Sequence, residues 1–207
     1  MFSYNKFLEF PIKIKNPNPR LANIVITQYG GANGELGASL RYLSQRYTMP
    51  DAVTKGLLTD IGTEELGHLE MVGTLVAQLS NGAPPKEWSE LGSWEYYADN
   101  GTSVFPQSSQ GTPFNAASIA VTGDPLTNLY EDLAAEQKAR AVYDNILRLS
   151  DDPDVNEVIK FLRQREVTHF QRFGEAKRKD TSKWFEKIIS DFSIYSTLFL
   201  SFRPQYE

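Results

Sequence analysis

The sequence predicts an all-α protein built as a four-helix bundle, and three observations support this prediction. Along four segments, apolar residues recur at steps of three and four, which is the period of a helix with one buried face. Capping side chains or prolines stand where several of these segments begin. A long connection over residues 80–122 separates the second segment from the third, so the third can start at the opposite end of the bundle.

The composition is that of one globular domain of 207 residues, with 41% hydrophobic residues and a net charge of −5. This acidic balance argues against a nucleic-acid partner. The absence of cysteine excludes disulfides, thiolate metal sites and cysteine nucleophiles, and it fits a cytoplasmic protein. Residues 1–6 lack a signal-peptide run, and the apolar stretch 192–202 is about half as long as a membrane span. We therefore expect a soluble protein with no membrane partner.

Residues 1–20 are expected to form an extended arm, because three prolines interrupt them: Pro11, Pro17 and Pro19. Apolar side chains alternate with polar ones along this arm, which suits a segment lying on its own bundle or on a neighbouring subunit. We assign residues 1–180 to one domain that includes this arm. Residues 181–207 form a C-terminal tail of unknown role, either an amphipathic segment or a poorly ordered end.

The first helix is predicted over residues 21–46. Its inward line is Leu21, Val25, Gln28, Ala32, Glu35, Ser39 and Tyr42. Three glycines, Gly30, Gly31 and Gly34, weaken the helix by about 1 kcal/mol each relative to alanine. They mark either a helix end or a place where another backbone approaches closely. Glu35 lies among small and apolar residues, so a buried Glu35 requires a partner.

The second helix is predicted to start after Asp51, as the N-cap, and to end near Leu79. The third runs from Asp124 or Pro125 to Leu149, and the fourth follows the turn 150–153 and ends near Lys179. The inward line of the second helix is Thr54, Leu58, Ile61, Glu65, His68, Val72, Leu75 and Leu79. That of the third is Leu126, Leu129, Leu133, Glu136, Arg140, Tyr143 and Leu147. That of the fourth is Val155, Ile159, Leu162, Glu166, His169, Phe173 and Ala176.

Two Glu-x-x-His motifs lie on these inward lines. The chain has only two histidines, His68 and His169, and each follows a glutamate by three residues, which places both side chains on one helix face. A lone pair of this kind is commonly a surface hydrogen bond. Here the two pairs are 101 residues apart, and so are two further pairs of inward residues: Glu35 with Glu136, and Tyr42 with Tyr143. This spacing predicts a helix pair used twice as a weak internal repeat.

The four helices therefore carry, in order, Glu, Glu-x-x-His, Glu and Glu-x-x-His. This ligand order is the one found in ferritin-like bundles that hold two metal ions. Buried together, four carboxylates and two imidazoles would be poorly solvated, and two divalent cations would compensate their charge. Oxygen and imidazole donors suit manganese or iron, and the lack of thiolates argues against a structural zinc site.

Longer stretches of the chain resemble the manganese catalase family, and they are most similar to its short spore-coat branch. They are residues 28–36, 40–47, 57–65, 123–126 and 134–141, and the resemblance extends over about residues 1–178. The resemblance implies two terminal ligands for each manganese ion and one bridging ligand: Glu35 with His68, Glu136 with His169, and Glu65 between the ions. It also implies that Glu166 moves protons close to the metals. Tyr42 matches a tyrosine that hydrogen-bonds at the edge of the site, although a plain core tyrosine fits the sequence equally well.

The reaction implied by the resemblance is dismutation of hydrogen peroxide to water and dioxygen, in a homo-oligomer that is a hexamer in the family. Two alternatives are a ferritin-like di-iron oxidase or iron-binding protein, and a structural spore-coat protein with a residual metal site. The expected location is the cytoplasm or the spore coat. The chain departs from other branches at Ala135, where some carry arginine, and at Tyr143, where another carries lysine. Arg140 either balances charge within the bundle or forms a pair on its rim.

Overall fold

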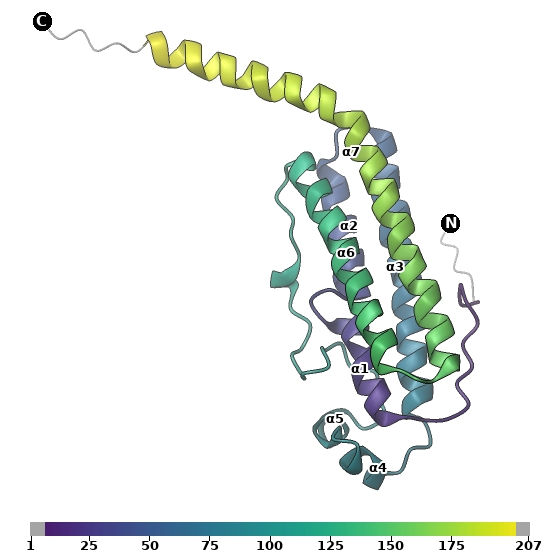
Figure 1. The fold of residues 1–207 in the computed structure, drawn as a ribbon. Helices are drawn as coiled ribbons and strands as arrows, with labels where there is room; N and C mark the ends of the chain where they lie inside the picture. The colour runs from purple at the N-terminus through teal and green to yellow at the C-terminus, as the bar shows by residue number, and fades with distance from the viewer. Residues whose placement is uncertain (1–6, 202–207) are drawn as a thin grey trace, which may run out of the picture.

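Long helices pack side by side around a shared core, and short helices lie in the connection between them (Figure 1). The computed structural model describes residues 7–201, with side chains described for residues 7–178. The long helices are α1 (Pro19–Gly30), α2 (Glu35–Gln45), α3 (Ala52–Ser80), α6 (Pro125–Leu149) and α7 (Pro153–Ser201). The short ones are α4 (Pro85–Glu90), α5 (Trp94–Asn100) and the 3-10 turns η1 (Arg46–Thr48) and η2 (Ala116–Ser118). Over the described residues there is no strand beyond one isolated bridge, Gln107 with Pro113, so the all-α prediction is confirmed.

The first predicted helix is in fact two helices, and the single helix expected over residues 21–46 was wrong. The chain leaves α1 at Gly31, whose N–H donates to the Thr27 carbonyl at 2.9 Å. Glycine is also required for packing, because a Cβ on Gly30 would collide with the backbone of Pro106 and Gln107 in the crossover connection. Both explanations offered for the glycines therefore hold. Ala32 was expected to point inward but is exposed, since it lies in the break.

The starts of α3, α6 and α7 agree with the sequence prediction. Asp51 caps α3 by accepting hydrogen bonds from the N–H groups of Val53 and Thr54, at 2.8 and 3.0 Å. Asp124 caps α6 through the Thr127 N–H at 2.7 Å. Every residue on the predicted inward lines of the second and fourth helices is buried. Helical periodicity therefore identified the correct faces of these two helices.

Helix α7 continues to Ser201, well beyond the end expected near Lys179, and its last part projects past the bundle (Figure 1). No proline or glycine interrupts residues 179–201, so no local signal ends the helix. The side chains that suggested an amphipathic segment lie outside the described ones, as do residues 202–207. The division into a domain over residues 1–180 and a tail over residues 181–207 stays a prediction.

The described part of the N-terminal arm lies on its own bundle, along α3 and α7 (Figure 1). Gln78 on α3 accepts a hydrogen bond from the Ile14 N–H at 2.8 Å and donates one to the Ile12 carbonyl at 3.1 Å. Phe10 stacks on Phe161 of α7 with ring centroids 5.0 Å apart. This arrangement agrees with the first of the two placements considered from the sequence.

The connection between α3 and α6 crosses from one end of the bundle to the other, as predicted (Figure 1). Trp88 is buried and packs against the rings of Tyr96 and Tyr97. Further along, Arg41 and Gln45 of α2 donate hydrogen bonds to carbonyls of this connection at 3.2 and 2.8 Å. Among the described helices, none combines the length and apolar character that a membrane-spanning segment needs.

The apolar core has two parts with a polar layer between them. On α3, Leu58 and Ile61 belong to one part, while Val72 and Leu75 belong to the other. Along α7 the order is reversed, because Leu162 belongs to the same part as Val72 and Phe173 belongs to the same part as Leu58. The residues between these limits include both Glu-x-x-His motifs, so apolar side chains cover the motifs from both sides along the bundle.

Candidate metal centre

The polar layer brings together all six residues that the sequence predicted to meet. Each is at most 1% exposed, and they come from α2, α3, α6 and α7: Glu35, Glu65, His68, Glu136, Glu166 and His169. Their oxygen and nitrogen atoms form two overlapping groups, in each of which all donor atoms lie within 4.8 Å of one another. One group contains Glu35 and His68, the other contains Glu136 and His169, and Glu65 and Glu166 belong to both.

Local structure explains how these side chains reach one layer. Glu35 is the first residue of α2, directly after the glycine break, where a carboxylate is favoured by the partial positive charge of the helix N-terminus. On α3 and α7, the Glu-x-x-His spacing stacks a carboxylate and an imidazole on the same face, one turn apart. Ser39 of α2 donates a hydrogen bond to the Gly62 carbonyl of α3 at 2.7 Å, which holds these two helices close at this level.

Glu65 lies at the centre of the layer, between the two histidines. Its Oε2 lies 2.7 Å from His68 Nδ1 and its Oε1 lies 2.8 Å from His169 Nδ1. Burial alone would raise the pKa of Glu65, but the two imidazoles lower it well below its usual value. Glu65 is therefore an ionised carboxylate that presents one oxygen to each half of the site.

The remaining carboxylates are placed symmetrically about Glu65. Glu35 Oε2 is 3.9 Å from His68 Nδ1, and Glu136 Oε2 is 3.7 Å from His169 Nδ1. Burial is the main cause that raises the pKa of both carboxyls, and the nearby charge of Glu65 adds to it. Without a compensating cation, burial therefore shifts both carboxyls towards the protonated form.

Two buried tyrosines hold the outer carboxylates in a crosswise arrangement. Tyr42 on α2 donates a hydrogen bond to Glu136 Oε1 on α6 at 2.5 Å, and its ring packs 4.9 Å from that of Phe173. Tyr143 on α6 donates a hydrogen bond to Glu35 Oε1 on α2. The sequence prediction did not include Tyr143 among the site residues, although its spacing of 101 residues from Tyr42 was the signal that could have identified it.

Glu166 differs from Glu65, its counterpart in the repeat. Its Oε1 is buried and has no hydrogen-bond partner among the described residues. Burial raises its pKa well above the usual value, and the charges of Glu35, Glu136 and Glu65 raise it further. The two carboxyls that both groups share are thus pushed in opposite directions, one towards the anion and the other towards the neutral acid.

Arg140 lies on the rim of the bundle, which decides between the two roles considered for it. Its guanidinium pairs with Asp144 at 2.5 Å and with the Gln137 side chain at 2.9 Å, and Asp144 also pairs with Arg163. Ala135, the residue directly before Glu136, is buried and supplies no positive charge there.

A further set of charged residues, absent from the sequence prediction, meets the outer edge of both imidazoles. Glu64 Oε1 lies 3.2 Å from His169 Nε2 and 3.6 Å from His68 Nε2. Arg165 Nε is 2.7 Å from the same oxygen. Glu9 of the arm approaches His68 Nε2 to 3.5 Å. Burial would raise the pKa of Glu64, but the imidazoles and the guanidinium lower it well below its usual value.

The donor set fits a pair of divalent metal ions. The layer offers carboxylate oxygens and imidazole nitrogens, which hard and borderline cations prefer. Glu136 Oε2 and Glu166 Oε1 are buried without a hydrogen-bond partner among the described residues, a costly state that a bound cation would relieve. The two groups of donor atoms overlap through the carboxylates that they share, Glu65 and Glu166.

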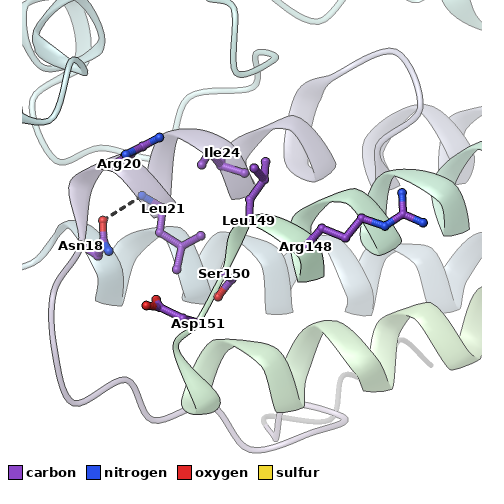
Figure 2. A pocket seen from close by; sticks show the side chains of 8 residues that line it. All are labelled: Asn18, Arg20, Leu21, Ile24, Arg148, Leu149, Ser150 and Asp151. Carbon is purple, nitrogen blue, oxygen red and sulfur yellow. Dashed lines mark hydrogen bonds between the residues drawn. The ribbon is translucent and has the colours of Figure 1, made fainter.

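The hollow seen in Figure 2 lies at one end of the bundle and contains none of these six residues. It is formed where α1 begins and where α6 turns into α7. Its lining residues are Asn18, Arg20, Leu21, Ile24, Arg148, Leu149, Ser150 and Asp151. Within it, Asn18 accepts a hydrogen bond from the Leu21 N–H at 3.0 Å and so caps the start of α1.

Comparison with known proteins identifies close relatives. A model of the family described as manganese containing catalase matches residues 1–192. The protein CotJC of Bacillus subtilis (strain 168) is 51% identical over 176 residues, which are 85% of this chain and 93% of that protein. A probable manganese catalase of Clostridium acetobutylicum is 36% identical over 203 residues, which are 96% of this chain and 90% of that protein.

Solved structures show the same architecture. The crystal structure of KatB, a manganese catalase from Anabaena, matches with a TM-score of 0.79 at 32% identity, covering 86% of this chain and 80% of that one. A dodecameric thioferritin, a bacterioferritin-related protein from Bacteroides fragilis, matches with a TM-score of 0.52 at 16% identity over 81% of this chain and 88% of that one. The second likeness concerns the fold alone and confirms the ferritin-like bundle.

Proposed function

We propose that the polar layer holds two manganese ions and that the protein dismutes hydrogen peroxide, because this chain belongs to the manganese-containing catalase family. The single observation that carries this proposal is the pair of overlapping donor groups with Glu65 in common. Glu35 and His68 would hold one ion as terminal ligands, and Glu136 and His169 would hold the other. Glu65 would be the bridging ligand shared by both ions.

The overall reaction converts two molecules of hydrogen peroxide into two of water and one of dioxygen. When bound, the manganese pair supplies the two-electron redox chemistry of this cycle, so no external reductant is required. The protein supplies ligand geometry, a dry layer and a route for protons. The apolar parts of the core cover the layer on both sides along the bundle and keep bulk water out.

Glu166 is proposed as the proton carrier. Dismutation moves protons between peroxide oxygens, and a general acid–base group near the metals accelerates that transfer. The contrast with Glu65 supports this role. The surroundings lower the pKa of Glu65, which stays ionised, and raise that of Glu166, which can carry a proton. Tyr42 fixes the orientation of Glu136, and Tyr143 does the same for Glu35.

Manganese is favoured over iron by the family of the relatives, since the donor atoms themselves suit either metal. A di-iron oxidase is therefore the second candidate, and a structural spore-coat protein is the third. We also propose a homo-oligomer, a hexamer on the family pattern, located in the cytoplasm or in the spore coat. Light scattering of the purified protein tests the oligomer, and a monomeric mass contradicts it.

The test of the function combines elemental analysis with oxygen evolution from hydrogen peroxide. We expect the purified protein to contain close to two manganese ions per chain and to release oxygen. The variant His169→Gln should lose activity by more than the ~10–100-fold typical of losing an outer hydrogen-bond partner. Glu175→Gln, an exposed change on the same helix, serves as the control and should keep both properties. Bound iron without oxygen release would contradict the proposal.

A further inference from the structure

We propose that Glu64 is a positioning residue shared by both histidine ligands, so that one carboxylate orients the two imidazoles of the metal centre. This inference rests on the proposed metal site and adds a residue to it. Glu64 directly precedes the bridging Glu65 in the sequence. Because neighbouring helix residues point about 100° apart, it reaches the opposite edge of the imidazoles from Glu65.

The orientation of the rings creates the need for such a residue. Both imidazoles direct Nδ1 towards Glu65, and the ring planes lie 21° apart with centroids separated by 5.6 Å. Nε2 of each ring therefore points away from the metal positions. A metal-bound imidazole almost always donates its other N–H to a carboxylate, a carbonyl or water, which fixes the ring and raises its basicity.

Both Nε2 atoms are buried, and neither forms an aligned hydrogen bond to a described residue. Glu64 Oε1 is 3.2 Å from that of His169, within hydrogen-bond range, and 3.6 Å from that of His68, slightly beyond it. The same oxygen thus lies between the two nitrogens. A small rotation of the rings upon binding ions would let both N–H groups donate to it.

Glu64 is itself held in place by α7. Arg165 Nε lies 2.7 Å from Glu64 Oε1, and only 16% of the Glu64 side chain is exposed. Arg165 also lies 3.9 Å from Glu9 Oε1, so the arm covers this contact from outside. A salt bridge between α3 and α7 therefore fixes the acceptor that both rings share. Loss of the carboxylate should weaken both metal positions together.

Asp60 offers a matched control for this proposal. It lies one turn before Glu64 on α3 and also pairs with an arginine of α7, Arg172, at 2.5 Å. Both pairs join the same two helices, but no ion pair joins Asp60 to a described histidine. Asp60→Asn therefore removes a salt bridge between the same two helices, at a side chain that is 64% exposed, without touching the histidine pair. Glu64→Gln and Glu64→Met remove the shared carboxylate.

The experiment titrates metal-free protein with Mn(II) alone, in competition with a chelator, and records stoichiometry and the EPR signal of the coupled ions. We expect Glu64→Gln to weaken binding of both ions, and Glu64→Met to weaken it by about 10–100-fold, because methionine offers no oxygen acceptor. Asp60→Asn should bind like the wild type. Circular dichroism of the metal-free variants separates this effect from failure to fold, since each variant should keep its helical signal and melt cooperatively.

Three results would overturn the assignment. The first is wild-type binding of both ions by both Glu64 variants. The second is weakening at one ion position only, which would show that Glu64 is not shared. The donor atoms of Glu9, Glu64 and His68 also lie within 4.8 Å of one another. The third result is therefore the loss of a further ion bound by this outer group, while the inner pair stays intact. A wild-type protein that binds no Mn(II) would instead refute the proposed function, and this inference with it.

Discussion

At the scale of single residues, the crosswise tyrosines are the most informative contacts of the site. Tyr42 and Tyr143 occupy equivalent places in the two halves of the chain, and each donates to the carboxylate of the opposite half. These contacts are already present without an ion, so each tyrosine holds a ligand carboxyl in one orientation before any ion binds. Once the carboxyls are ionised the contacts strengthen, because hydrogen bonds to charged acceptors contribute more than neutral ones.

The change Tyr143→Phe tests this role. The ring is fully buried, so phenylalanine should pack in the same space while Glu35 loses its donor. A hydrogen bond to a charged group contributes about 1.5–3 kcal/mol, so we expect peroxide turnover to fall by about tenfold or more. Oxygen evolution at saturating peroxide measures it. Tyr42→Phe should give a similar loss through Glu136. Unchanged turnover in both variants would show that the hydroxyls only provide hydrogen-bond partners for buried atoms and do not support the reaction.

At the scale of helices, the break between α1 and α2 places the first ligand. It begins a new helix at Glu35, and it lets the crossover connection lie directly on Gly30. The glycines that weaken the predicted helix therefore help to position Glu35 in the site. Gly56, near the start of α3, is different because a Cβ there would meet no atom within 4 Å.

Gly30→Ala and Gly56→Ala form a matched pair of helix variants. Gly30→Ala should destabilise the protein by several kcal/mol, in the upper range for single substitutions, because the added Cβ meets backbone rather than a flexible side chain. Gly56→Ala should stabilise it by about 0.5–1 kcal/mol, since alanine is the better helix former. Urea unfolding of both variants gives the two free energies. Equal effects would contradict the close approach of the connection to α1.

At the scale of the whole molecule, the bundle encloses a layer of charge that it cannot neutralise well by itself. Burial raises the pKa values of Glu35 and Glu166, and contacts with carboxylates outweigh burial to raise those of His68 and of His169, the latter to about 11. In the folded metal-free protein these groups hold more protons than in the unfolded chain. Their favourable contribution is complete below the unfolded pKa values, near 4.5 for the carboxyls and 6.5 for the histidines.

It follows that metal-free protein should lose stability as pH rises from 5 to 8, because the folded state binds more protons across this window. Metal binding requires the ligands among these groups, Glu35, His68 and His169, in their deprotonated form, so it should release protons and strengthen as pH rises. We therefore expect the gain in melting temperature on adding Mn(II) to be larger at pH 8 than at pH 6. Differential scanning calorimetry measures both trends. A metal-free protein that becomes more stable towards pH 8 would contradict the assigned protonation.

The candidate site was largely predictable because its pattern is local. Helical period places Glu65 beside His68, and Glu166 beside His169, whatever the rest of the chain does. The sequence repeat then related the two pairs to Glu35 and Glu136. Two other residues escaped prediction for a physical reason. Glu64 acts through a ring nitrogen that sequence cannot orient, and Tyr143 acts on a carboxylate 108 positions away.

By itself, the sequence determined the all-α class, the starts of α3, α6 and α7, and the six side chains that meet, because caps, prolines and helical period act within a few residues. Only the tertiary structure decided where the first helix breaks, which tyrosine serves which carboxylate, and that one oxygen of Glu64 faces both histidines. These features depend on how close two helices or a helix and a loop approach each other. That distance is set by packing across the core, and no segment of the chain contains it alone.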